Sequence, residues 1–86
     1  MRWIERDDRD FYDAYRALGA QVSRQRARHR LSQRELAELC GTTQSAIARL
    51  EGGGRAPRLD TLIRVANALD CELVVRLRPR TEGGKR

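Results

Sequence analysis

Three side chains with the chemistry to read DNA bases stand close together in the sequence: Gln44, Ser45 and Arg49. A glutamine amide can bond adenine bidentately, an arginine can bond guanine in the same way, and a serine can contact either kind of base edge. On a helix these three positions share one side, while Ile47 and Leu50 share the other. The pattern predicts a short helix whose polar side could lie in the major groove of DNA.

A preceding helix and a tight turn are expected to position these residues. Ser32 and Glu35 have the spacing of a capping box, in which each side chain accepts a hydrogen bond from the other residue's backbone amide. Apolar residues then recur at helical spacing up to Gly41, a residue type that commonly ends helices in the left-handed conformation. Thr43 can cap the next helix. Residues 33–52 therefore predict two short helices joined by a turn, which is the helix-turn-helix unit.

At these residues the sequence resembles the Cro-type, or XRE-like, helix-turn-helix repressor family, in the style of HigA- and HipB-type antitoxins. The matching positions are Gln33, Ala37, Gly41, Thr43, Gln44, Ile47, Leu50 and Glu51. The resemblance covers roughly residues 18–69. It implies a mostly α, lambda-repressor-like domain of four to five helices that binds double-stranded DNA. A helical hairpin with a merely solvated polar side is the alternative.

The resemblance also suggests which side chains would contact DNA. Base reading is expected from Gln44, Ser45 and Arg49. Contacts to the phosphate backbone are expected from Gln33, Thr42, Thr43, Arg55 and Arg58. Gln33 would in addition brace Gln44. Arg58 stands where the family often has a serine helix cap, and this departure favours a phosphate contact over capping.

Length, charge and composition limit the remaining possibilities. With 86 residues the chain can form one domain with a modest core, and its net charge of +6 favours an anionic partner. No apolar run approaches a membrane span and the N-terminus is too charged for a secretory signal, so we expect a cytoplasmic protein without a membrane partner. His29, Cys40 and Cys71 lack metal-ligand spacing. We therefore expect no metal, no cofactor and no enzymatic activity, and we interpret both cysteines as small buried apolar residues.

The residues before the helix-turn-helix unit predict an arm and one long helix. Residues 1–9 are interpreted as an N-terminal arm, with Trp3 packing on the chain's own core. From Asp10 to about Arg30 the apolar positions recur at helical spacing, which starts the first helix two turns earlier than in the resembled family. This aromatic extension could thicken the core, bind a second subunit or hold a protein partner. The arginines near its end, Arg24, Arg26, Arg28 and Arg30, could cap the helix or contact phosphate.

The residues after the unit predict a loop, a helix and a strand. Gly52–Gly54 is expected to be a loop, and a fourth helix is expected over Leu59–Leu69. Its core face is predicted to hold Leu59, Leu62, Ile63, Ala66 and Leu69. Residues 71–78 alternate, with Leu73, Val75 and Leu77 on one side, which predicts a strand. Because a lone strand leaves its backbone groups unpaired, we expect it to pair antiparallel with a second copy. Residues 79–86 are interpreted as a disordered tail.

Residues 10–78 are thus interpreted as one DNA-binding domain acting as a homodimer on a palindromic operator. The function favoured at this stage is a transcriptional repressor, the autoregulating antitoxin of a type II toxin–antitoxin pair with a possible toxin partner. The first alternative is a stand-alone regulator of the phage or mobile-element type. The second alternative is a protein-interaction module that does not bind DNA.

Overall fold

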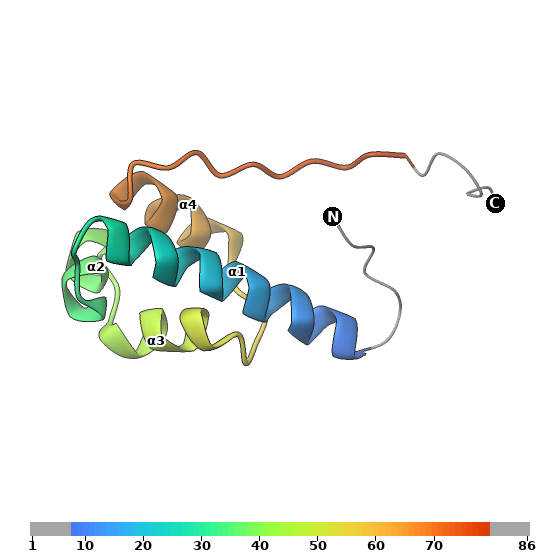
Figure 1. Cartoon of the computed structure of the whole chain (residues 1–86), viewed down its shortest axis with the longest axis horizontal. Coiled ribbons are helices and arrows are strands. Elements are labelled where there is room, and N and C mark those ends of the chain that lie inside the picture. Colours follow the sequence, from blue (N-terminus) through green and yellow to red (C-terminus); the bar gives the residue numbers. More distant parts are fainter. Residues whose placement is uncertain (1–7, 80–86) are drawn as a thin grey trace.

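The computed structural model describes residues 8–79, with side chains from Phe11 onward. It contains the helices α1 (Asp8–Arg28), α2 (Gln33–Cys40), α3 (Gln44–Gly52) and α4 (Leu59–Ala68), and the described residues contain no strand. In Figure 1, α1 crosses the molecule as its longest rod, α3 lies on one side of it, α4 lies on the other, and α2 closes one end. The prediction of a mostly α domain of four to five helices is confirmed, with four helices in residues 8–79. The predictions for Trp3 and for residues 80–86 fall outside the described residues.

The local signals of the helix-turn-helix unit form as the sequence predicts. Ser32 Oγ accepts from the Glu35 amide at 3.0 Å, and Glu35 Oε1 accepts from the Ser32 amide at 2.8 Å, so the capping box is complete. Gly41 ends α2 with a φ of 69°, in the left-handed region where only glycine is unstrained. Thr43 Oγ1 accepts from the Ala46 amide at 3.1 Å and caps α3. Both ends of the turn are therefore set by short-range hydrogen bonds.

The long first helix supports α3 through close backbone contact. A Cβ on Gly19 would lie 2.5 Å from the carbonyl oxygens of both Leu50 and Glu51. Gly53, which ends α3 with a φ of 71°, would likewise place a Cβ 2.6 Å from the Cα of Arg16. The two glycines allow α1 to touch the last turn of α3 directly. Gly19, which costs helix propensity, is thus explained by packing between helices.

The core lies where α1, α2, α3 and α4 meet. It is formed by Val22, Leu36, Ala37, Cys40, Ile47, Leu50, Val65 and Leu69. Ile47 and Leu50 are the buried side of α3, as predicted. The first turns of α1 extend beyond this core, and Phe11 and Tyr12 are exposed there. The rings of Tyr12 and Tyr15 contact each other edge to face. The aromatic extension therefore adds little to the core.

Helix α4 buries a different face from the one predicted. Leu59 and Ile63 are exposed, so their assignment to the core was wrong, and Val65 is buried instead. The stripe that faces the core consists of Leu62, Val65, Ala66 and Leu69. This stripe and the predicted one overlap, and helical periodicity alone cannot choose between them. Contact with α2 decides the rotation of α4 about its axis.

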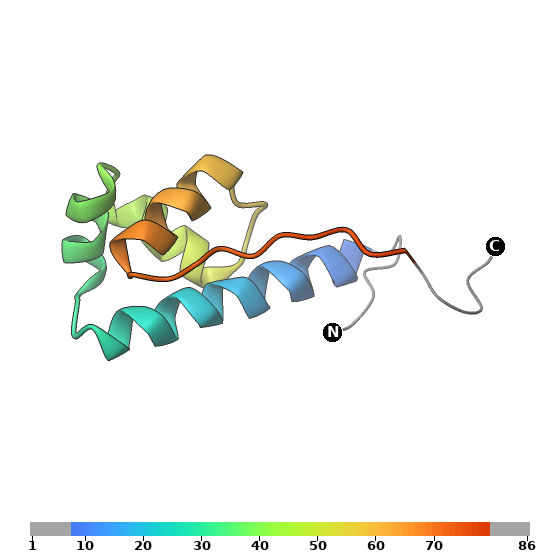
Figure 2. The same ribbon diagram turned by 90° about the horizontal axis from the view of Figure 1, so that it is seen from above.

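The predicted strand is extended but unpaired among the described residues. Asp70, with a φ of 53°, ends the α4 turn, and the Cys71 amide donates to the Ala66 carbonyl at 2.8 Å. From there residues 71–79 run back beside α4 and then project beyond the helical body (Figures 1 and 2). No backbone hydrogen bond joins residues 72–79 to another described residue. The strand and its pairing in a dimer therefore stay a prediction.

Candidate nucleic-acid interface

The outer face of α3 presents the residues predicted to read bases. Gln44, Ser45 and Arg49 are exposed, whereas Ile47 is fully buried and Leu50 is buried beside it. Among the described residues, no hydrogen bond or ion pair joins these three polar side chains to another group. Their donors and acceptors are available to a ligand. The helix that bears them is fixed from behind by its apolar side.

The residues predicted to contact the DNA backbone at the helix starts differ in exposure and in their hydrogen bonds. Thr43 is exposed at the start of α3, where its hydroxyl oxygen already accepts from Ala46. Thr42 is half-buried in the turn, and its amide donates to the Ala37 carbonyl at 2.9 Å. Gln33 begins α2, but its side chain donates to Glu51 at 3.0 Å and does not brace Gln44 as predicted. The backbone amides at the starts of α2 and α3 remain suited to phosphate.

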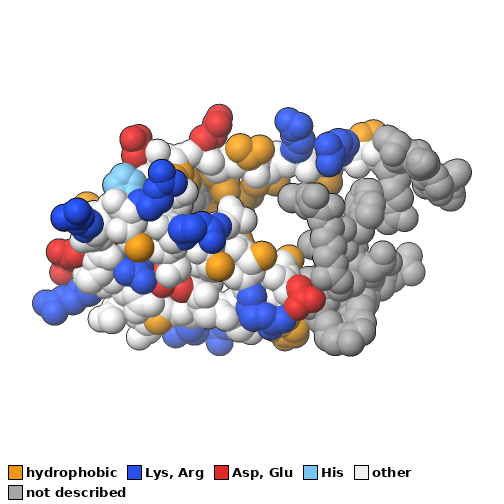
Figure 3. Space-filling view, viewed as in Figure 1, with side chains coloured by type: hydrophobic (Ala, Val, Ile, Leu, Met, Phe, Trp, Pro, Cys, Tyr) orange, Lys and Arg blue, Asp and Glu red, His pale blue; other side chains and the backbone are white. Residues whose placement is uncertain are grey.

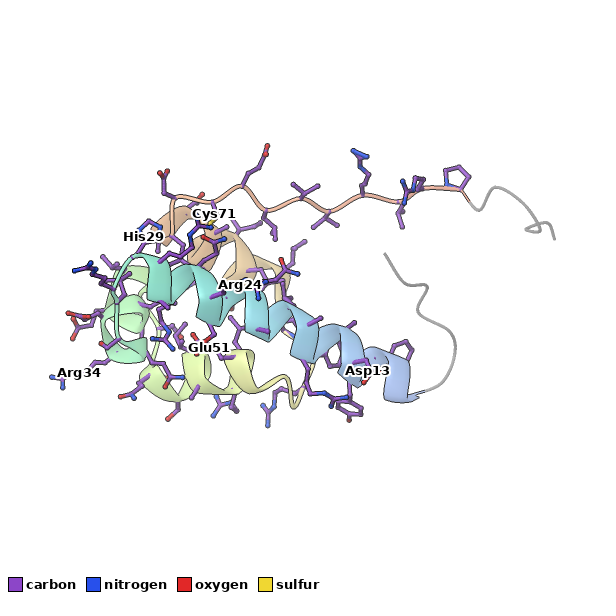
Figure 4. The ribbon with its side chains drawn as sticks, viewed as in Figure 1. Asp13, Arg24, His29, Arg34, Glu51 and Cys71 are labelled. Atoms are coloured by element: carbon purple, nitrogen blue, oxygen red, sulfur yellow. The ribbon has the colours of Figure 1, made fainter. Side chains whose placement is uncertain are left out.

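A polar network that sequence reasoning missed joins α1, α2 and the end of α3. Arg26 Nε donates to Glu51 Oε2 at 2.7 Å and Arg26 Nη2 donates to Glu51 Oε1 at 3.0 Å. Gln33 donates to the same carboxylate from α2, and Arg26 Nη1 donates to the Leu31 carbonyl at 2.8 Å. In Figure 4 Glu51 points from α3 toward α1. The Arg26 side chain, which is 19% exposed, is therefore engaged within the protein.

The charge state of this network is set by opposing effects on Glu51. Burial would raise the pKa of the Glu51 carboxyl, but the hydrogen bonds from Arg26 and Gln33 and the charge of Arg26 outweigh it and lower that pKa below its ordinary value. The Glu51 bond correspondingly raises the pKa of Arg26. The sequence held one signal for this pair. Glu51 follows Ile47 by one helical turn, so an acid falls on the buried side of α3 and requires a basic partner.

Two arginines lie beside an open cleft at the end of α3. Arg49, Gly52, Gly54 and Arg55 line it, and its volume is about 360 Å³. Since glycines form the rest of the lining, little bulk keeps an anion from the two guanidinium groups. Arg58 is exposed at the start of α4, where it does not cap the helix but bonds both oxygens of Asp60, at 3.0 and 3.1 Å. A phosphate would have to compete with Asp60 for Arg58.

We also searched the described part of the chain for a metal site, a membrane-spanning helix and a reactive cysteine. Its residues form no group of three or more potential metal ligands, and no helix there is long and apolar enough to cross a membrane. Cys40 is buried in the core, which raises the pKa of its thiol, and Cys71 is half-buried against that core. The prediction of a buried apolar cysteine is therefore confirmed for Cys40, whereas Cys71 is only partly buried and its thiol donates to the Leu69 carbonyl at 3.4 Å. Arg24, Arg28, His29 and Arg30 are exposed.

Comparison with known proteins agrees with this geometry. The HTH-type transcriptional regulator y4dL of Sinorhizobium fredii, itself uncharacterized, is 44% identical over 55 residues, which are 64% of this chain and 28% of that protein. The chain thus matches little more than a quarter of that relative's length. The restriction-modification controller protein C.AhdI of Aeromonas hydrophila is similar in structure, with a TM-score of 0.70 and 33% identity over 73% of this chain and 91% of the controller.

The family comparison covers the same residues as the predicted unit. The profile described as helix-turn-helix matches residues 22–75, which include α2, α3 and α4. Both the family and the fold are those of DNA-binding regulators. The chain belongs to the XRE-like helix-turn-helix family.

Proposed function

We propose that this protein is a sequence-specific transcriptional regulator that binds double-stranded DNA as a homodimer and places α3 in the major groove. The observation that supports this most strongly is the exposed outer face of α3. Gln44, Ser45 and Arg49 there have no partner among the described residues, on a helix whose other side is buried. Each of them has a hydrogen-bonding pattern suited to base edges. In a dimer the two copies of α3 would lie roughly 34–36 Å apart on a palindromic operator.

The backbone contacts that we propose surround this face. Arg55 lies beside Arg49 at the open cleft, Arg58 follows it closely in the sequence, and the starts of α2 and α3 carry the exposed cap residues Ser32 and Thr43. Arginines and helix starts of this kind bind phosphate and fix the register of a protein on the duplex. Thr42, Thr43 and Gln33 would complete these contacts. Gln33 would do so while its amide group holds Glu51.

A stand-alone regulator of the mobile-element type is the biological role that we favour. The similar solved structure is a restriction-modification controller protein, and the similar curated protein is a transcriptional regulator. Neither of these two is described as an antitoxin, so the comparisons favour the alternative role over the antitoxin role that we first preferred. Whether the regulator represses its target can be measured with a reporter gene placed behind the selected operator.

Selection of bound sites from random duplex DNA tests the proposal directly. We expect a palindrome whose half-sites are about one helical turn apart. Arg49→Ala should cost roughly 1–3 kcal/mol of binding and relax the preference at one base pair. Arg24→Ala is the matched control for sequence preference, because Arg24 is an exposed arginine of α1 and not of α3 (Figure 4). Selection that returns no motif, or an Arg49→Ala variant with unchanged preference, would contradict the proposal.

A further inference from the structure

Residues 72–78 form an exposed, extended edge whose partner the described chain does not supply. None of their backbone groups is bonded to another described residue, and Val74, Val75 and Leu77 are exposed, Leu77 completely. In Figure 3 hydrophobic and basic side chains both stand out along this segment. An open edge with apolar side chains readily adds another strand. The question is which strand, and in which register.

We propose that this segment pairs with the same segment of a second copy, antiparallel, with Val75 on the two-fold axis. The inference rests on the homodimer of the proposed function and specifies its geometry. In this register Leu73 lies opposite the partner's Leu77, and Val75 lies opposite itself. On the other side of the ribbon, Glu72 lies opposite the partner's Arg78, and the symmetry repeats that pair.

Side-chain alternation eliminates half of the other registers. Directly opposed residues of an antiparallel pair point to the same side. A shift of one residue would therefore place Leu73, Val75 and Leu77 on the side that bears the partner's charged residues. An axis at Arg76 keeps the alternation but brings two like charges directly opposite each other, which is unfavourable.

The strongest remaining competitor, an axis at Val74, is disfavoured by the end of α4. It would pair Asp70 with the partner's Arg78 and Cys71 with the partner's Leu77. However, Asp70 has a φ of 53°, and the Cys71 amide already donates to the Ala66 carbonyl. These two residues belong to the helix end and cannot join a strand. Only the short run 72–76 would remain paired, against 72–78 with Val75 on the axis.

The burial of residues 71–74 agrees with the apolar side that the alternation assigns to this segment. Cys71 packs against the core, and Leu73 is half-buried, whereas Glu72 and Val74 are exposed. The apolar side of the segment is therefore the side that faces the helical body at its start. Val75 and Leu77 continue that side beyond the body, where the partner's Leu73 would cover Leu77. The charge pattern is complementary to itself, which favours a second copy over an unrelated strand.

Two opposite charge changes test the register. In E72R alone and in R78E alone, like charges would face each other twice across the axis, so each variant should dimerise roughly tenfold or more weakly than the parent chain. When the two variants are mixed, every opposed pair regains unlike charges, and a heterodimer should form with about the parent's affinity. With Val74 on the axis the mixture would not recover. Light scattering and native mass spectrometry measure both results. Glu72 and Arg78 are exposed, so folding should be unaffected.

R76E is the matched control, because it changes the same charge on the same segment but faces the partner's Val74. It should weaken the dimer much less than R78E. The proposal would be overturned if R76E weakened the dimer more than R78E did, or if the mixture of E72R and R78E did not recover. It would also be overturned if none of the three changes altered the dimer affinity. In a C71S background, oxidation should cross-link V75C between copies much faster than V74C, and the reverse order would place Val74 on the axis.

A separate measurement, binding to the selected operator, tests the proposed function. If the parent dimer binds its palindrome but the mixture does not recover, the regulator stands and the register is wrong. If the mixture recovers but no duplex is bound, the register stands and the function is wrong.

Discussion

Removing the charge of Glu51 should destabilise this protein far more than removing any exposed charge. Its side chain is 8% exposed and that of its partner Arg26 is 19% exposed, and Gln33 donates to the same carboxylate. Removing one member of a fully buried ion pair typically costs about 3–5 kcal/mol. Because Arg26 can partly rehydrate, we expect Glu51→Gln to lower the free energy of unfolding by about 2–3 kcal/mol. For a domain this small that is a drop in Tm of roughly 10–20 °C.

The control and the pH dependence make this prediction specific. Glu38→Gln removes the same charge, but Glu38 and Arg34 are 71% and 77% exposed and lie 3.9 Å apart, so the change should cost at most about 0.5 kcal/mol. The lowered pKa of Glu51 means that the stabilisation is present above its ordinary value of 4.5 and is lost as the pH falls through the lower folded value. Urea denaturation at fixed chain concentration, at neutral and acidic pH, measures both effects. Equal losses for Glu51→Gln and Glu38→Gln at neutral pH would refute the reasoning.

Further predictions concern single residues. Gly19→Ala should destabilise the protein by about 1–3 kcal/mol, because its Cβ would lie 2.5 Å from backbone oxygens of α3. Gly52→Ala should instead stabilise it by about 0.5–1 kcal/mol, because Gly52 lies in a helix with open space around it. Thermal unfolding of the two variants measures both effects. Ser32→Ala removes the 3.0 Å cap and should cost about 1 kcal/mol in the same assay. Arg58→Ala should weaken binding to all duplexes alike and reduce the salt slope by about one unit, and a changed sequence preference would contradict its phosphate role.

The parts of this fold that the sequence predicts are those set by short-range chemistry. Ser32 with Glu35, Gly41 and Thr43 each act within one helical turn, and all of them form as predicted. The polar side of α3 also follows from local spacing, because Ile47 and Leu50 leave only one way to orient that helix. The candidate interface could therefore be located from the sequence, although its contacts with DNA stay predictions.

The parts that sequence reasoning missed depend on contacts between distant segments. Gly19 has no local reason to be glycine, since its partner atoms lie in α3. Arg26 looked like one of several arginines at a helix end, and only its reach to Glu51 distinguishes it. Leu59 and Ile63 fit a core stripe by periodicity, but the rotation of α4 against α2 exposes them.

These distant contacts explain why α3 can be short and why α1 must run from Arg16 to Arg26 along it. A helix of 9 residues is only marginally stable by itself, yet α3 must present its side chains in a fixed orientation. α1 holds it at successive points: Arg16 against Gly53, the backbone of Gly19 against the last turn, and Arg26 bonded to Glu51. Each contact acts at the end of α3 farther from Thr43, so the capped start and the supported end together fix the helix. We therefore expect that loosening α1 from α3, as Gly19→Ala would do, weakens binding to the selected operator even though Gln44, Ser45 and Arg49 are intact, which a gel shift would measure.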